Sequence, residues 1–164
     1  MHGYTQLFFF SSSSSFPFPS ISSIAFSCQN LSVEASKVVR FVLERMSFKD
    51  ESKGSCLGVE LPVELKVVQD ADRLDAIGAV GIARCFMFGG SRNGSLIEWK
   101  KDPVAGVTNE DGIVYKSCVG HFYEKLLKLK GMMKTRRGTE LAEDRHKVML
   151  DFLSQIQEEC RVDW

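Results

Sequence analysis

The chain has 164 residues, the size of one ordinary domain, so a single hydrophobic core is expected. Its 21 Lys and Arg balance its 21 Asp and Glu, and 44% of its residues are hydrophobic, which gives no general attraction to nucleic acid or to a membrane. Its five cysteines are widely spaced and contain no CxxC pair, which excludes a recognisable disulfide framework or zinc knuckle and favours a reducing, cytoplasmic location.

The first 30 residues differ in composition from the rest. No Lys, Arg, Asp or Glu occurs before Glu34, the run Ser11 to Ser15 is uniform, and the six phenylalanines follow no helical or strand period. We expect residues 1–30 to be a disordered, low-complexity leader with no membrane span. Two explanations stay open: a segment that replaces a lost amino-terminal part, or a weak transit peptide to a plastid or mitochondrion, although it lacks the usual arginines.

Helical periodicity begins near residue 32. Ser32 is a suitable N-cap, and the helix after it carries an apolar stripe at Ala35, Val38, Val39, Val42 and Met46, with Lys37, Arg40, Glu44 and Arg45 left for solvent. A polar loop is expected at 49–58. Pro62 then suits the first turn of a second helix, which we expect to continue to about Phe86 and to stop at Gly89-Gly90.

Residues 91–116 show no period and predict a long irregular loop, a kind of segment that is often functional. Two more helices are expected, from Val119 to about Met133 and from Glu140 to about Cys160. The buried stripe of the last helix is Leu141, Val148, Met149, Phe152, Leu153 and Ile156. The pattern therefore predicts an all-α bundle, with residues 31–164 as the folded domain.

The run VVQDADRLDAIGAVGIAR, residues 67–84, places three aspartates in a small-residue, apolar stretch. On a helical wheel both faces are apolar, which predicts a central helix packed on all sides, with Asp72 in its alanine stripe. A buried, unpaired carboxylate is costly, so Asp72 should meet a cation, hydrogen-bond donors or a water-filled cleft. Asp70 and Asp75 are expected on flanking sides, served by Arg73 and solvent. A structural role for such an aspartate remains as open as a metal-binding one.

Three segments carry a resemblance to a known family: the run at 67–84, HFYEKLLKLKGMMKTRRG at 121–138 and LAEDRHKVMLDFL at 141–153. Together they resemble the carboxy-terminal two-thirds of the small HD-domain phosphohydrolases, over residues 31–164. DADRLDAIGA is the most specific of these pieces. The resemblance implies an all-helical bundle that holds one divalent metal, typically manganese or magnesium, through a His, a His-Asp dipeptide and a later Asp. It also implies cleavage of phosphate esters or anhydrides, often those of nucleotides.

Asp72 matches the last metal ligand of that family, and the other ligands have no match. The chain contains no His-Asp dipeptide and no His between His2 and His121. One carboxylate cannot offset the dehydration of a divalent ion. We therefore expect an incomplete metal site, doubtful metal binding, and impaired or absent activity in this form. We also expect that the amino-terminal helices are missing or replaced, and that exposed core faces make the domain only marginally stable.

His121 and Lys125 lie one helical turn apart and are candidate contacts for a substrate phosphate. The wider basic cluster is Lys125, Lys128, Lys130, Lys134, Arg136 and Arg137. An alternative is that the acidic helix at 140–163 neutralises this cluster. The basic cluster lacks interleaved aromatic residues, so the sequence does not indicate a nucleic-acid partner.

The expected partner is a phosphorylated small molecule such as a nucleotide. The alternative function is a non-catalytic pseudo-hydrolase or interaction module that pairs with a second copy or with an intact relative. Hydrolysis with added Mn²⁺ separates the two functions, because only the enzyme should show metal-dependent turnover.

Overall fold

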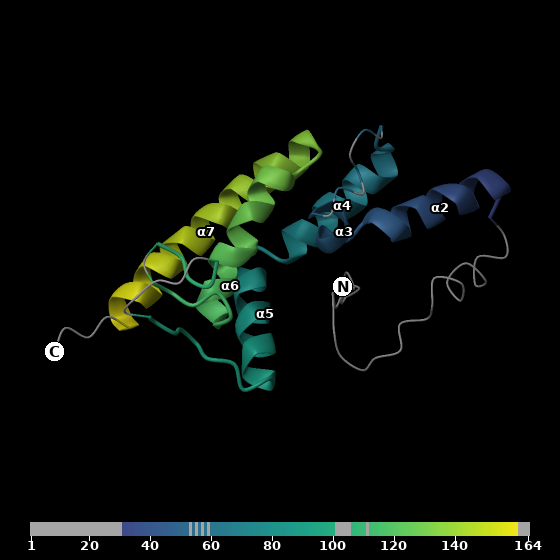
Figure 1. Ribbon diagram of the computed structural model, residues 1–164. Helices are drawn as coiled ribbons and strands as arrows, with labels where there is room; N and C mark the ends of the chain where they lie inside the picture. Colours follow the sequence, from purple (N-terminus) through teal and green to yellow (C-terminus); the bar gives the residue numbers. More distant parts are fainter. Residues whose placement is uncertain are drawn as a thin grey trace, which may run out of the picture. The chain divides into compact units, whose positions relative to one another are not determined.

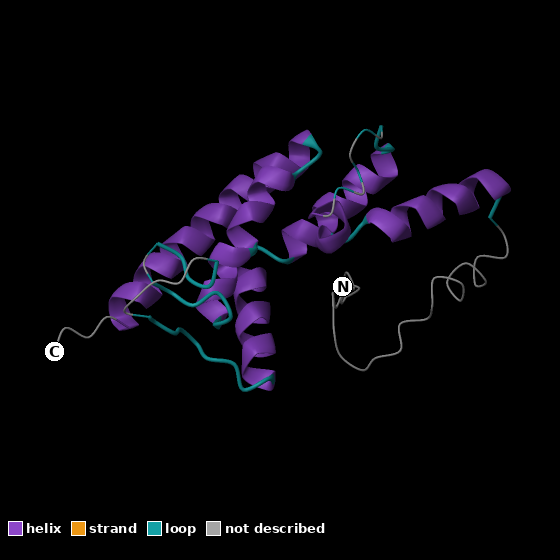
Figure 2. Cartoon of the chain, in the orientation of Figure 1, coloured by secondary structure: helices purple, strands orange, loops and turns teal. Residues whose placement is uncertain are grey.

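A computed structural model describes residues 31–160, apart from 53, 55, 57, 59, 101–105 and 111. The predicted leader lies outside the described residues. The chain divides into two compact units, residues 1–60 and residues 61–164. Figures 1 and 2 show helices joined by turns and loops, with no strand in the described part, which confirms the predicted all-α class.

The first unit contains helix α2, Val33–Arg45, and the short helix α3, Phe48–Ser52. The backbone N–H of Ala35 donates to the Ser32 hydroxyl at 3.2 Å, which confirms the predicted N-cap. The polar loop expected from residue 49 is wrong at its start, because α3 occupies it. Arg45 also departs from prediction, since its guanidinium lies 4.2 Å from the centre of the Phe41 ring.

The second unit begins with helix α4, Val63–Asp75, and helix α5, Gly78–Ser91, which are bent by 66° at their junction. The prediction of one continuous helix is wrong. The N–H of Ala76 turns back to the carbonyl of Arg73 at 3.1 Å, and Gly78 has φ +75, a left-handed conformation that favours glycine. The apolar run across the break hides this stop signal in the sequence.

The remaining helices are α6, Cys118–Glu124, the 3₁₀ helix η1, Leu126–Met132, and α7, Arg136–Cys160. The helix predicted from Val119 to Met133 is therefore two elements, which change direction at Lys125 (φ −134, ψ −57). Helix α7 begins four residues before the predicted Glu140. The long α7 lies against α4, α5 and η1 within this unit (Figure 1).

The core of the second unit lies along α7. Its largest fully buried apolar side chains are Leu65, Ile77, Ile113, Val119, Phe122, Leu129 and Met149. Phe122 packs with Phe86 and Phe152 at ring-centroid distances of 6.0 and 6.1 Å, which joins α5, α6 and α7. The predicted stripe of α7 is correct at Met149 and Leu153, but Val148 is 44% exposed.

The segment between α5 and α6 is irregular in its described parts, as predicted. Two isolated antiparallel bridges, Trp99 with Ile113 and Thr108 with Val114, fold it back on itself. Ile113 and Val114 are buried and anchor its second half in the core. No single helix among the described residues is long and apolar enough to cross a membrane, and α4 and α5 meet that measure only when taken together as a bent pair.

Candidate functional site

Asp70 is a structural residue, contrary to the solvent-side position expected for it. Its side chain is 3% exposed, and its carboxylate accepts hydrogen bonds from the backbone N–H of Lys134 at 2.7 Å and of Thr135 at 2.8 Å. The Thr135 hydroxyl donates a third bond at 2.7 Å. Thr135 in turn accepts from the N–H of Gly138, so Asp70 fixes the start of α7.

Arg73 is equally buried, at 1% exposure, rather than on the solvent-facing side expected for it. Its guanidinium donates to the carbonyl of Met132 at 2.7 Å, at the end of η1. Arg73 and Asp70 lie three residues apart and point toward the same junction between η1 and α7. Helix α4 is thus attached to that junction through buried, charged side chains rather than through apolar contact alone.

Asp75 and the bend between α4 and α5 are held by two arginines. Arg84 donates to the Asp75 carboxylate and, at 3.2 Å, to the Asp75 carbonyl. Arg145 of α7 donates to the carbonyl of Leu74, and a Cβ added at Gly78 would lie 2.9 Å from its side chain. Both arginines thus donate to carbonyls at the carboxy-terminal end of α4, where the helix dipole favours cations.

Asp72 differs from its two neighbours. It is half-buried, in the last turn of α4, and it makes no hydrogen bond or ion pair within the part of the chain that the structure describes. The central, all-round packed helix predicted for this run is wrong here, because Ala71, Ala79 and Ala83 are exposed. Asp72 is therefore the aspartate of the DADRLD run that remains available to a ligand.

His121 and Lys125 lie at the two ends of the last turn of α6. The N–H of Lys125 donates to the carbonyl of His121 at 3.0 Å, which keeps the predicted spacing of one turn. The His121 ring lies 3.3 Å from the Glu124 carboxylate, and its side chain is 40% exposed. None of the described hydrogen bonds or ion pairs joins either residue to Asp72.

The basic cluster is partly neutralised by α7, which is the alternative weighed for it. Lys130 lies 2.7 Å from Glu143, and the guanidinium groups of Arg136 and Arg137 lie 3.1 and 3.2 Å from Glu140. The hydrogen bond from Lys130 holds the pKa of Glu143 below its usual value. Close to this pair, burial and the Lys130 charge lower the pKa of His146, against a smaller opposing effect of Glu143.

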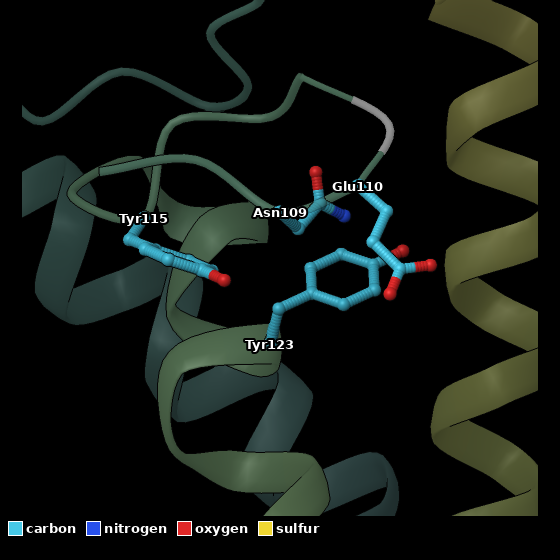
Figure 3. A pocket seen from close by; sticks show the side chains of 4 residues that line it. All are labelled: Asn109, Glu110, Tyr115 and Tyr123. Atoms are coloured by element: carbon cyan, nitrogen blue, oxygen red, sulfur yellow. The ribbon is translucent and has the colours of Figure 1, made fainter. Parts of the chain in front are cut away.

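A pocket of about 250 Å³ lies apart from these residues, where the irregular segment meets α6 (Figure 3). Asn109, Glu110, Tyr115 and Tyr123 line it. The Tyr123 hydroxyl accepts a hydrogen bond from Gln157, near the end of α7. Sequence analysis missed this pocket, because its lining residues are single polar and aromatic side chains without a motif.

Two cysteines meet between α5 and α6. The Cys85 thiol lies 3.6 Å from the Cys118 carbonyl, and a Cβ added at Gly89 would collide with the Cys118 sulfur. Burial, reinforced by Cys118, raises the pKa of Cys85 to about 11. Both side chains are free thiols that remain protonated at neutral pH, so they serve packing rather than nucleophilic chemistry.

The described residues do not by themselves form a metal centre. No group of three or more His, Cys, Asp or Glu side chains comes close enough there to hold an ion. Asp72 offers one carboxylate, whereas hard divalent ions need several converging ligands. The donor set of this part of the chain is thus incomplete for a metal.

No family model matches the sequence. The chain is 43% identical over 125 residues to the curated Bacillus subtilis protein YpgQ, which covers 76% of this chain and 52% of that protein. A crystal structure of YpgQ matches with a TM-score of 0.64 and 38% identity, over 86% of this chain and 65% of YpgQ. The chain therefore spans about half of the curated relative and less than two thirds of its solved structure.

An HD-superfamily hydrolase from Bacillus thuringiensis is 36% identical, with a TM-score of 0.50, over 85% of this chain and 70% of that structure. The all-helical fold and the DADRLDAIGA run agree with this match. The chain belongs to the HD superfamily. One of the matching YpgQ structures is a complex with ADP, at 36% identity and a TM-score of 0.60.

Proposed function

We propose that this chain is a metal-dependent phosphohydrolase of the HD superfamily, that it acts on nucleotides or other phosphate esters and anhydrides, and that its activity is impaired or absent in this form. Three findings support the proposal. The chain belongs to a superfamily with a solved member described as a hydrolase, its relative YpgQ was crystallised with ADP, and the half-buried Asp72 has no protein donor among the described residues.

The observation that carries the proposal is the contrast within the DADRLD run. Asp70 and Asp75 each accept hydrogen bonds from donors of the protein. Asp72 has no such donor among the described residues. A half-buried carboxylate in the last turn of a helix is disfavoured twice, by lost hydration and by the negative end of the helix dipole. A bound cation at Asp72 would remove both penalties.

Impaired activity follows from the incomplete donor set. Further metal ligands would have to come from residues outside the described part or from another chain, because the described residues contain no group of three or more His, Cys, Asp or Glu side chains that could hold an ion. His121 and Lys125 are proposed as phosphate contacts. Both are at least partly accessible to solvent, and a lysine and a histidine one turn apart can present two donors to one phosphate.

The test measures binding and turnover separately in the same chain. Because the phosphate oxygens of ADP would add ligands to the one that Asp72 offers, we expect calorimetry to detect weak ADP binding in the presence of Mn²⁺. We expect phosphate release from nucleoside triphosphates to be weak or absent. Asp72→Ala should abolish the Mn²⁺-dependent part of both signals. Rapid turnover that depends on Asp72 would support the class and contradict the impairment, whereas no Mn²⁺-dependent binding would contradict the proposal.

The second candidate is a non-catalytic module that pairs with a second copy or an intact relative. It is favoured by apolar side chains that α4 and α5 leave exposed, with Val63 at 64%, Val80 at 60% and Met87 at 75%. Light scattering together with the ADP titration distinguishes the two candidates. A stable dimer that binds no ADP would favour this module over the enzyme.

A further inference from the structure

The pocket between the irregular segment and α6 combines aromatic rings with one acidic side chain. Tyr115 and Glu110 come from the irregular segment, and Tyr123 comes from α6. Figure 3 shows both phenol rings extending into the space beneath Asn109, with the Glu110 carboxylate beyond Tyr123. The pocket has a volume of about 250 Å³, enough for the end of a side chain or a small organic ion.

The wall that carries Glu110 is held in place before any ligand binds. Asn109 and Ile113 exchange two backbone-directed bonds, in which the Ile113 N–H donates to the Asn109 side chain at 2.8 Å and the Asn109 N–H donates to the Ile113 carbonyl at 3.0 Å. Gly112 closes the turn with φ +79 and a bond to the Asn109 carbonyl. Ile113 itself is fully buried, so this turn is anchored in the core.

The opposite wall is also fixed. Gln157 of α7 donates to the Tyr123 hydroxyl, which orients the ring. The N–H of Tyr115 donates to the Val107 carbonyl at 2.9 Å. The Tyr123 ring is thus held by a side-chain partner and Tyr115 by its backbone, and these two tyrosines are two of the four lining residues.

This lining favours a flat cation. Aromatic faces attract cations, a carboxylate supplies the opposing charge, and phenol and amide oxygens accept N–H donors. A guanidinium group is planar, permanently charged and carries five N–H donors, so it can stack on a ring and bond to a carboxylate at the same time. An ammonium ion would use the charge but not the flat geometry.

The pocket is separate from the DADRLD run. Tyr123 bonds to Gln157, whereas Arg145 bonds to Leu74 beside Asp72. These two positions of α7 are 12 residues apart, about 18 Å at about 1.5 Å per residue. A ligand in the pocket would therefore be a second ligand rather than part of a phosphate compound at Asp72.

We propose that this pocket binds a guanidinium group, either as free arginine or as an arginine side chain of a peptide. Glu110 supplies the ionic hydrogen bond, Tyr115 and Tyr123 supply the aromatic faces, and the core-anchored turn holds them in register. This proposal is independent of the proposed phosphohydrolase activity, which does not require the pocket.

The experiment titrates the full chain with L-arginine and records backbone amide shifts by NMR. Citrulline, the neutral analogue of similar shape, is the ligand control, and lysine tests charge without planarity. An arginine amide capped at both ends distinguishes free arginine from a peptide side chain. We expect saturable shifts at residues 107–123 with arginine at millimolar concentration, several-fold weaker binding of lysine and no saturation with citrulline.

Variants locate the binding. Glu110→Gln should weaken arginine binding at least about tenfold, and the exposed Glu64→Gln of α4 should leave it unchanged. Tyr115→Leu should weaken binding about threefold, whereas Tyr115→Phe, which keeps the ring, should stay within about twofold. Equal shifts with citrulline, or full binding by a folded Glu110→Gln chain, would overturn the proposal.

Discussion

At the scale of single residues, the three aspartates of the DADRLD run have different roles. Asp70 attaches α4 to the start of α7, Asp75 holds the bend with Arg84, and Asp72 has no protein donor in the described part. The helical wheel set Asp72 apart from the other two but could not predict the burial of Asp70, because its donors, residues 134 and 135, are distant in sequence. The sequence was informative for Asp72 only, through the wheel and the family pattern.

Asp70→Asn should lower the free energy of unfolding by about 2 kcal/mol, because a charged acceptor of three hydrogen bonds becomes a neutral amide in a buried place. Urea unfolding followed by circular dichroism measures this change. Asp144→Asn, at an exposed position of α7, is the matched control and should change stability by less than about 0.5 kcal/mol. Equal stabilities of the two variants would contradict the role given to Asp70.

His146 predicts a pH dependence of stability. Burial and Lys130 lower its pKa in the folded chain below the usual 6.5, so the unfolded chain binds its proton more readily. The stability that the neutral His146 contributes is fully present above pH 6.5, and it is lost as the pH falls toward the lowered pKa of the folded chain. His146→Gln should therefore lose less stability than the native chain between pH 7.5 and pH 5.5 in thermal unfolding, and a larger loss would contradict this assignment.

At the scale of the elements, the sequence predicted helices where apolar spacing was strong and failed where a helix stops inside an apolar run. Ser32 and the stripe of α2 were sufficient to place the first helix. The break at Ala76 and Ile77 was missed, because apolar residues continue through it and only Gly78 marks the change of direction. The early start of α7 was missed although a neighbouring residue caps it, because the Thr135 hydroxyl accepts the Gly138 N–H and the distant Asp70 in turn accepts from Thr135.

Gly78→Ala tests the bend between α4 and α5. The φ of +75 is strained for alanine, and the added Cβ would meet the Arg145 side chain at 2.9 Å, so we expect a loss of about 1–3 kcal/mol in unfolding free energy. Gly90→Ala in α5 is the control, because nothing lies within 4 Å of its Cβ. There alanine should be neutral or stabilising by up to about 1 kcal/mol, and a Gly78→Ala chain of native stability would show that the bend is not needed.

At the scale of the whole molecule, α4 and α5 leave a set of apolar side chains exposed: Val63, Val67, Val80, Met87 and Phe88. Exposed core faces are what the resemblance to the family led us to expect, whereas the apolar pattern of residues 67–84 alone predicted a helix packed on all sides. Such a surface favours association in water.

We predict concentration-dependent self-association in size-exclusion chromatography with light scattering. Met87→Glu should shift the chain toward monomer, because it places a charge at an exposed position of α5. Leu150→Glu alters an apolar side chain of α7 that is exposed to 46% and serves as the matched control. A native chain that stays monomeric at all concentrations, or an equal effect of both variants, would contradict the prediction.

The most direct measurement compares Asp72→Asn with the native chain in unfolding and in Mn²⁺-dependent binding of ADP. The account predicts that the variant keeps its stability within about 0.5 kcal/mol, since Asp72 makes no described hydrogen bond or ion pair, and that it loses the Mn²⁺-dependent binding. A variant that unfolds as readily as Asp70→Asn, or that binds ADP with Mn²⁺ as the native chain does, would contradict it.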